Sequence, residues 1–246
     1  MDHSPTRDAA IREELAHYSP VMRAVEIMAL LTFTLLFGVV MWMLVQAAPG
    51  RVWMLVAGAV LSLLVMDFMS GLVHWFADTW GTSKWFILGP TLIRSFREHH
   101  VDRFAITRHD FIETNGATAL VALPPLIGAL LLRGSLQHDA LFFAASLLGF
   151  ISLWALFTNQ FHKWAHMGRP PAVILALQKR GIVLSIPHHA EHHRGEFDQS
   201  YCITTGWLNP LLNRVQFFRR LEALITGLTG AEPRTEDKVL ISAVKG

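Results

Sequence analysis

Apolar residues along this chain are gathered into four runs that are long enough to cross a lipid bilayer. A membrane-spanning helix requires about 20 consecutive, mostly apolar residues. The runs cover residues 25–46, 52–73, 118–132 and 140–157, and the only acidic residues inside them are Glu26 and Asp67. The pattern predicts an all-α, polytopic membrane protein with about four transmembrane helices.

The segments between the runs carry the residues that end helices. Residues 47–51 read Ala-Ala-Pro-Gly-Arg, and a short polar turn at 133–139 joins the third run to the fourth. Proline and glycine interrupt helices because they remove a backbone donor or add flexibility. A fifth apolar segment, 171–186, is interrupted by Gln178, Lys179 and Arg180, so it predicts a membrane-surface or re-entrant helix rather than another span.

Basic residues are divided unequally among the connecting segments. Three Lys and Arg precede the first run, five lie between the second and third, eleven follow the fourth, and the two remaining turns hold one each. By the positive-inside rule, both termini and the long middle segment are expected in the cytoplasm. A soluble helical bundle is the alternative, but it does not explain this division. We expect a polar cytoplasmic tail at 1–24, a membrane domain at 25–231 and a second polar tail at 232–246.

Composition narrows the chemistry further. Only 16% of the 246 residues are charged, against about 25% in an ordinary soluble domain. The net charge of +2 is small and scattered, which argues against nucleic-acid binding. Cys202 is the single cysteine, so an intrachain disulfide or thiolate cluster is impossible, whereas there are 13 histidines. Any metal must be held by nitrogen and oxygen.

The first histidine group lies at the end of the second run. His74 and Asp78 are four residues apart and therefore share one face of a helix. Asp67 lies on the same stripe, deeper in the membrane, where an acidic side chain indicates a functional site. We expect it to accept a hydrogen bond from a histidine ring, which would fix the ring's orientation. A hydrogen bond that only packs helices is the alternative for Asp67.

The second group follows in the long middle segment. His99 and His100 are adjacent and come directly after Glu98. Adjacent side chains on a helix diverge by about 100°, which suits either two metal ions or one ion with an outer contact. His109 follows nine residues later, and a structural hydrogen bond explains it as well as ligation does. Glu98 and His109 are therefore candidates for contacting a metal ligand rather than the metal itself.

The third and fourth groups follow the last run. Asn159, His162 and His166 fall on one helical face, so the two histidines are candidate ligands and Asn159 can hold a metal-bound water. The fourth group is the most specific signal, because it places four imidazoles in six residues. Its members are His188, His189, His192 and His193. A solvated histidine-rich loop would not be accompanied by three further groups.

The number of candidate ligands exceeds what one ion accepts. A zinc site uses three or four protein ligands, so eight to ten imply two ions. The His-Glu-x-x-His pattern of zinc proteases is absent from the sequence. Two histidine-bound irons beside a membrane can activate dioxygen to cleave an unactivated C–H bond.

The sequence around these groups resembles the plasmanylethanolamine desaturases, a family of membrane lipid desaturases related to the plant chloroplast fatty acid desaturase 4 type. The matching strings lie at 70–81, 96–100, 106–115, 158–166, 188–193 and 201–209. The resemblance implies an O2-dependent enzyme that introduces the 1′–2′ vinyl-ether double bond into an alkyl-ether phospholipid. It also implies two iron ions and electrons from cytochrome b5 or another separate donor, because the chain has no haem, flavin or ferredoxin signature.

Carried onto this chain, the resemblance places metal ligands on His74, Asp78, His99, His100, His162, His166, His189, His192 and His193. One ligand position is left open, which His109 or His188 can fill. An acyl-lipid desaturase or hydroxylase with the same site is the competing interpretation. A metal transporter or sensor is another, but its ligands would lie near the middle of the bilayer.

Overall fold

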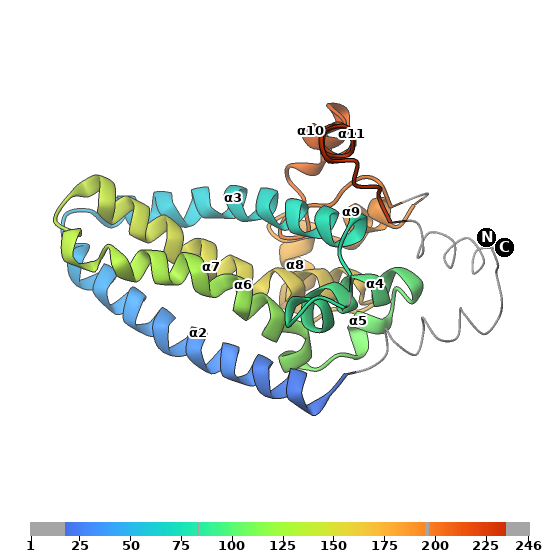
Figure 1. Cartoon of the computed structure of the whole chain (residues 1–246). Helices are drawn as coiled ribbons and strands as arrows, with labels where there is room; N and C mark the ends of the chain where they lie inside the picture. The colour runs from blue at the N-terminus through green and yellow to red at the C-terminus, as the bar shows by residue number, and fades with distance from the viewer. Residues whose placement is uncertain (1–17, 83, 195–196, 235–246) are drawn as a thin grey trace, which may run out of the picture.

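The computed structural model describes residues 18–82, 84–194 and 197–234, and these residues form helices joined by turns. The greater part of both expected polar tails, residues 1–17 and 235–246, lies outside the described residues. Four long helices lie side by side and form the body of the molecule: α2 (Pro20–Ala47), α3 (Val52–Thr79), α6 (Phe111–Leu131) and α7 (Asp139–His166) (Figure 1). Each is long and apolar enough to cross a membrane, which confirms the predicted all-α fold with four candidate spans.

The helices are longer than the apolar runs that predicted them. α3 continues six residues beyond the second run, and α7 continues nine beyond the fourth. α6 begins at Phe111, seven residues before its run, and Pro124 and Pro125 lie inside it. Neighbouring helices support a proline in a membrane helix. Because the helices continue past the apolar runs, polar side chains extend from rigid elements.

Local sequence fixes several helix starts. The Ser19 hydroxyl accepts a hydrogen bond from the Met22 N–H at 3.2 Å, and Pro20 occupies the first turn of α2. The Asp110 carboxylate accepts from the Glu113 N–H at 3.0 Å at the start of α6. These side chains satisfy backbone donors that the helix itself leaves free.

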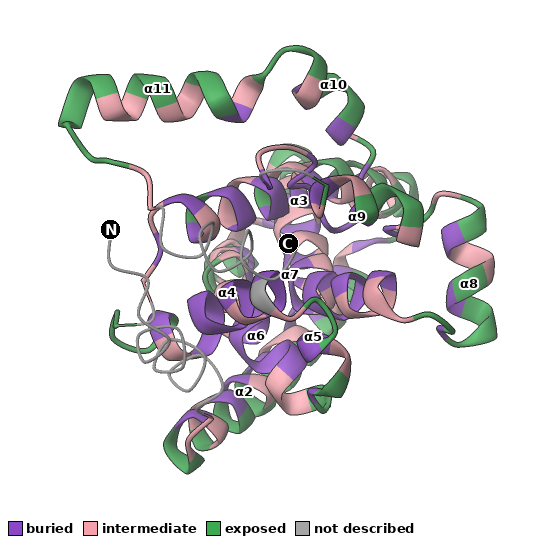
Figure 2. Ribbon diagram, turned by 90° about the vertical axis from the view of Figure 1, so that its right-hand side faces the viewer, coloured by how far each residue is buried: buried purple, intermediate pink, exposed green. Residues whose placement is uncertain are grey.

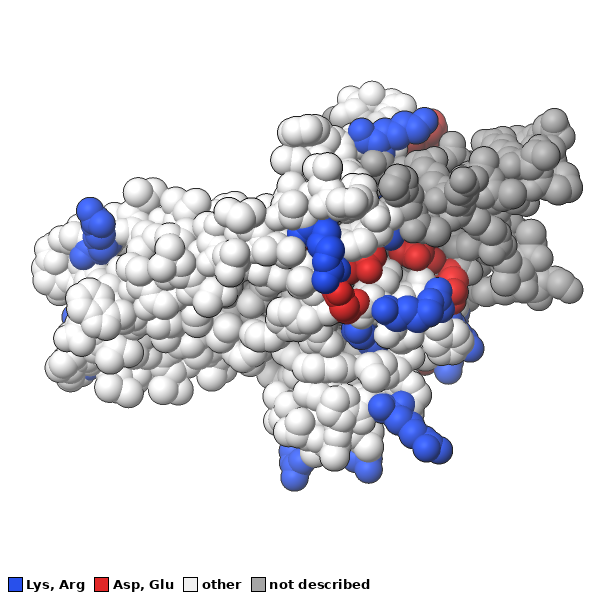
Figure 3. All heavy atoms as spheres, turned by 90° about the horizontal axis from the view of Figure 1, so that it is seen from below, with Lys and Arg blue, Asp and Glu red and all other residues white. Residues whose placement is uncertain are grey.

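The apolar core lies between α2, α6 and α7. Its fully buried large side chains include Leu44, Leu126 and Phe142. α6 and α2 approach each other closely at Gly116, where a Cβ atom would lie 2.2 Å from the Glu26 Cβ. The outer faces carry exposed apolar side chains such as Leu35, which is 68% exposed. Few charged side chains lie along the four-helix bundle. Most of those in view gather at the end that holds the short helices, and a few others lie at the opposite tip (Figure 3).

The short helices lie at that charged end. They are η1 (Gly89–Ile93), α4 (Arg94–Val101), α5 (Ala105–Arg108), α8 (Ala172–Lys179), α9 (Ile186–His192), α10 (Asn209–Arg214) and α11 (Phe217–Thr229). A one-turn helix, η2 (Arg133–Ser135), joins α6 to α7 at the far end. α8 and α11 stand away from the bundle (Figure 2). With eight residues, α8 is too short to cross a bilayer, as expected for the segment 171–186.

Candidate metal centre

Four helices bring the histidine groups together at one end of the bundle. The groups lie at the end of α3, in the last turn of α4, at the end of α7, and on α9 with the residue that follows it. Nine candidate ligands then separate into two sets. The first set contains His99, His162, His166, His189 and His193, and the second contains His74, Asp78, His100 and His192.

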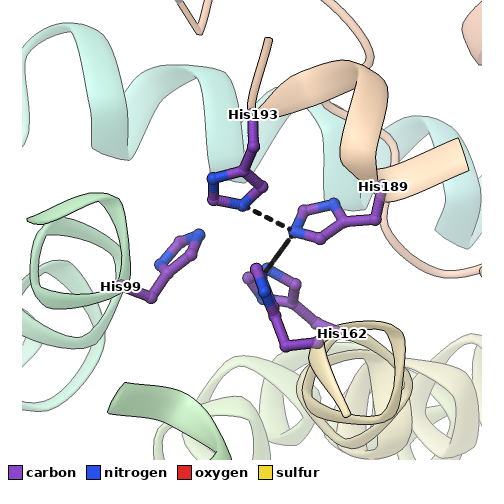
Figure 4. Close-up of side chains that lie close together, drawn as sticks. His99, His162, His189 and His193 are labelled. Carbon is purple, nitrogen blue, oxygen red and sulfur yellow. Dashed lines mark hydrogen bonds between the residues drawn. The ribbon is translucent and has the colours of Figure 1, made fainter. Parts of the chain in front are cut away.

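In the first set the ring nitrogens point toward a common space (Figure 4). The His189 Nε2 atom lies 2.8 Å from His162 Nε2, 2.7 Å from His166 Nε2 and 3.0 Å from His193 Nε2. A neutral imidazole nitrogen carries one proton or one lone pair, so these three contacts cannot all be hydrogen bonds. Nitrogens bound at right angles to one ion, each about 2.1 Å from it, lie about 3 Å apart. The arrangement therefore fits a metal ion.

In the second set a carboxylate joins three imidazoles. The Asp78 Oδ2 atom lies 3.2 Å from His74 Nε2 and 3.7 Å from both His100 Nε2 and His192 Nε2. The two last nitrogens are 3.1 Å apart. All four side chains are at least nine-tenths buried from solvent. One acidic oxygen and three nitrogens form a donor set that fits a second metal ion.

Two of the three pairs of adjacent histidines at the site are divided between the two sets. His99 belongs to the first and His100 to the second, and His193 and His192 are divided in the same way. The rings of His99 and His100 have centroids 4.4 Å apart. Adjacent side chains on a helix point in different directions, so one histidine of each of these pairs faces the first set and the other faces the second. The structure therefore contains two neighbouring candidate metal positions.

Burial keeps these imidazoles neutral. It lowers the pKa of His99, His100 and His189 well below the ordinary histidine value, and it lowers the pKa of His192 to about 4. Neighbouring imidazoles lower the first three further. A neutral imidazole offers a lone pair, which is the form that binds a metal.

Backbone carbonyls fix which nitrogen carries the proton. The Nδ1 atoms of His74, His99 and His192 lie 3.1, 3.2 and 2.8 Å from the carbonyl oxygens of Tyr201, Ser95 and Gln199. A carbonyl only accepts hydrogen bonds, so each Nδ1 is protonated and each Nε2 keeps its lone pair. The His99 Nε2 atom is buried without a hydrogen-bond partner among the described residues, as expected of a metal ligand. The sequence gives no signal for these three oxygens because every residue has a carbonyl.

Asp67 has a different role from the one expected. It is fully buried, and its carboxylate accepts hydrogen bonds from the backbone N–H groups of Thr205, Gly206 and Leu208 at 2.7, 2.8 and 3.0 Å rather than from a histidine ring. It thereby holds the segment 201–208 against α3, and the Tyr201 carbonyl in this segment orients His74. Asp67 is thus connected to His74 through the backbone of this segment and not by a direct hydrogen bond.

The other residues expected around the metal ligands are Asn159, Glu98 and His109, and of these three Asn159 lies beside a candidate ligand, whereas Glu98 and His109 contact each other. The Asn159 amide donates to the Thr114 carbonyl at 2.9 Å, and its oxygen lies 3.4 Å from His162 Nδ1. His109 lies outside both sets, with its Nε2 atom 3.2 Å from Glu98 and 3.5 Å from Glu113. The structure thus favours the structural hydrogen bond for His109.

His188 is the one expected ligand that the structure does not bring to either set. It is exposed on α9, whereas its neighbour His189 is only 1% exposed. One turn of helix cannot direct both side chains to the same side. The nine other expected ligands all lie in the two sets.

Comparison with known proteins identifies the family of this chain. The lipid desaturase domain family matches residues 63–236. Plasmanylethanolamine desaturase of Myxococcus xanthus is 46% identical over 220 residues, covering 89% of this chain and 78% of the relative. Plasmanylethanolamine desaturase 1 of Mus musculus is 42% identical over 243 residues, which cover 96% of this chain and 89% of the relative.

A more distant relative is the chloroplastic fatty acid desaturase 4 of Arabidopsis thaliana. It is 34% identical over 178 residues, which cover 70% of this chain and 52% of the relative. No solved structure matches the chain. The family match includes every residue of both candidate ligand sets. The chain, a multi-pass membrane protein with a buried histidine cluster, therefore belongs to the lipid desaturase family.

Proposed function

We propose that this protein is a di-iron, O2-dependent plasmanylethanolamine desaturase. It would remove two hydrogens from the first two carbons of the alkyl-ether chain and leave a 1′–2′ vinyl ether. Together with O2, two electrons and two protons, this forms two water molecules. The observation that carries the proposal is the pair of buried ligand sets on a chain that is 46% and 42% identical to plasmanylethanolamine desaturases.

Two irons would be held by the two ligand sets, with five histidines for one and three histidines with Asp78 for the other. When bound, the irons supply the O2 activation that side-chain acids and bases lack. The chain's own residues keep the imidazoles neutral, orient them through backbone carbonyls and exclude water by burial. Electrons would come from cytochrome b5 or another separate protein.

The position of the site supports the choice of carbons. Both sets lie at one end of the bundle, at the level of the short surface helices (Figure 1). By the charge division, this end and both termini would face the cytoplasm. A metal site near the bilayer surface reaches carbons near the glycerol backbone rather than those in the middle of a chain.

Lipid analysis tests the proposal. Purified protein with an alkyl-ether phosphatidylethanolamine, O2, iron and a reductant should yield lipid two mass units lighter that releases a fatty aldehyde in acid. Metal analysis of the active protein should find about two irons per chain, since nine ligands exceed one ion's capacity. Activity with stoichiometric zinc alone would refute the iron assignment.

An acyl-lipid desaturase is the second candidate, favoured by the similarity to the Arabidopsis fatty acid desaturase 4. In that case two hydrogens would be lost from an ester-linked acyl chain. Acid would then release no aldehyde, and this difference separates the two functions.

A further inference from the structure

A cavity of about 390 Å³ opens beside the first ligand set. His166, His189 and His193, three of the five histidines of that set, form part of its wall. The cavity lies where the segment before α5, the end of α7 and α9 meet, and α7 contacts both α5 and α9. It therefore connects the protein surface to one candidate metal position.

The wall of this cavity is apolar close to the histidines. Phe104, Met167 and Ile186 line it, and Phe104 is 49% exposed. Apolar walls favour hydrocarbon over water. The volume is near the lower end for small-molecule pockets, about 300 to 1,000 Å³. It suits a few polar groups and the first carbons of a chain, not an entire lipid.

Two exposed arginines complete the wall. Arg103 comes from the segment before α5, with its guanidinium 4.8 Å from the centroid of the Phe104 ring. Arg194 follows α9, where its guanidinium contacts the Glu191 carboxylate at 2.5 Å. An exposed ion pair of this kind contributes little stability, so an anion of the ligand can compete for Arg194. The two arginines come from separate parts of the chain and border the same opening.

We propose that this cavity binds the phosphodiester of the lipid substrate, with Arg103 and Arg194 contacting the phosphate oxygens. A guanidinium presents paired N–H donors that match the oxygens of a phosphate. The carbons joined to the glycerol would then lie along the apolar wall beside His166, His189 and His193. This inference rests on the proposed function and adds to it the cavity and the two arginines that would contact the phosphate.

Binding measured without turnover tests the inference separately from the function. Iron-loaded protein in neutral detergent, kept without O2 and reductant, is titrated with an alkyl-ether phosphatidylethanolamine and with the matching alkyl-acyl-glycerol that lacks phosphate. Wild-type protein should bind the phospholipid at least tenfold more tightly. The Arg103→Gln, Arg194→Gln double variant should raise the Kd for the phospholipid about tenfold and leave the Kd for the neutral lipid unchanged.

Arg220→Gln is the matched control, because Arg220 is an exposed arginine on α11 outside the cavity wall, and it should bind both lipids as the wild type does. If the double variant unfolds, the Arg103→Lys, Arg194→Lys variant replaces it. This variant should show a smaller loss of affinity for the phospholipid and no loss of affinity for the neutral lipid. Equal affinity of wild type and double variant for the phospholipid would overturn the inference. So would displacement of the lipid by inorganic phosphate at low millimolar concentration, which indicates a site for a soluble anion. Neither result depends on whether the protein forms a vinyl ether.

Discussion

The Asp67 carboxylate accepts a hydrogen bond from the Thr205 backbone N–H at 2.7 Å, joining residues that are 138 positions apart. The same oxygen accepts from Gly206 at 2.8 Å, and the other accepts from Leu208 at 3.0 Å. This one buried acid therefore attaches an entire loop to α3. The loop in turn supplies the carbonyl oxygen that orients His74.

Replacing Asp67 with Asn should destabilise the protein. An amide has one acceptor oxygen, so its NH2 group would face a backbone N–H, and a buried unsatisfied donor costs about 1–3 kcal/mol. We expect a lower Tm in thermal unfolding in detergent. Asp139→Asn is the control, because Asp139 is an exposed acid paired with Arg51 at the other end of the bundle. Loss of iron with an unchanged Tm would instead support a direct contact between Asp67 and a histidine.

His189 and His188 are neighbours that should respond differently to substitution. His189→Ala removes a nitrogen that lies within 3.0 Å of three other imidazole nitrogens. We expect loss of about one iron per chain and loss of desaturation. His188→Ala removes an exposed ring and should retain both. Metal analysis together with product formation checks the pair, and an equal loss in both variants would return His188 to the site.

The stability of the metal-free protein should fall in acid. Burial lowers the pKa of His192 to about 4, whereas an unfolded histidine has a pKa near 6.5. Between these values the unfolded chain binds a proton that the folded chain does not, so stability is complete above about pH 6.5 and decreases as the pH falls toward 4. Each such histidine contributes a slope of up to about 1.4 kcal/mol per pH unit.

Thermal unfolding at several pH values measures this slope. His192→Gln should reduce it by the contribution of this one histidine, because glutamine does not titrate. The pH dependence would be attributed to other groups if wild type and variant showed the same slope between pH 6.5 and 4.

Gly116 should not tolerate a side chain. A Cβ atom there would lie 2.2 Å from the Glu26 Cβ and 3.0 Å from its Cα, so α2 and α6 would have to separate. Gly116→Ala is expected to lower stability by about 1–3 kcal/mol, seen as a lower Tm in detergent. Gly128→Ala is the control in the same helix, because its Cβ would meet only the Leu148 Cδ1 at 3.4 Å. A similar Tm for both variants would show that the helices adjust at Gly116.

The sequence by itself determined the four spans and the residue types of the site. A run of about 20 apolar residues is typical of a membrane-spanning helix. Helical spacing alone places His74 beside Asp78 and His162 beside His166. These features depend on neighbours within a few residues. For that reason the order of residues along the chain is enough to predict them.

Only the tertiary structure decided how the histidines are divided between two candidate ligand sets and what orients them. Helical period tells which side chains share a face, but not which helix lies opposite that face. It therefore could not separate His188 from His189, or assign His109 to Glu98 and Glu113. The carbonyl partners of the rings, and the loop that Asp67 holds, depend on backbone atoms that every residue carries. Such atoms leave no signature in a sequence, and only the fold brings them into place.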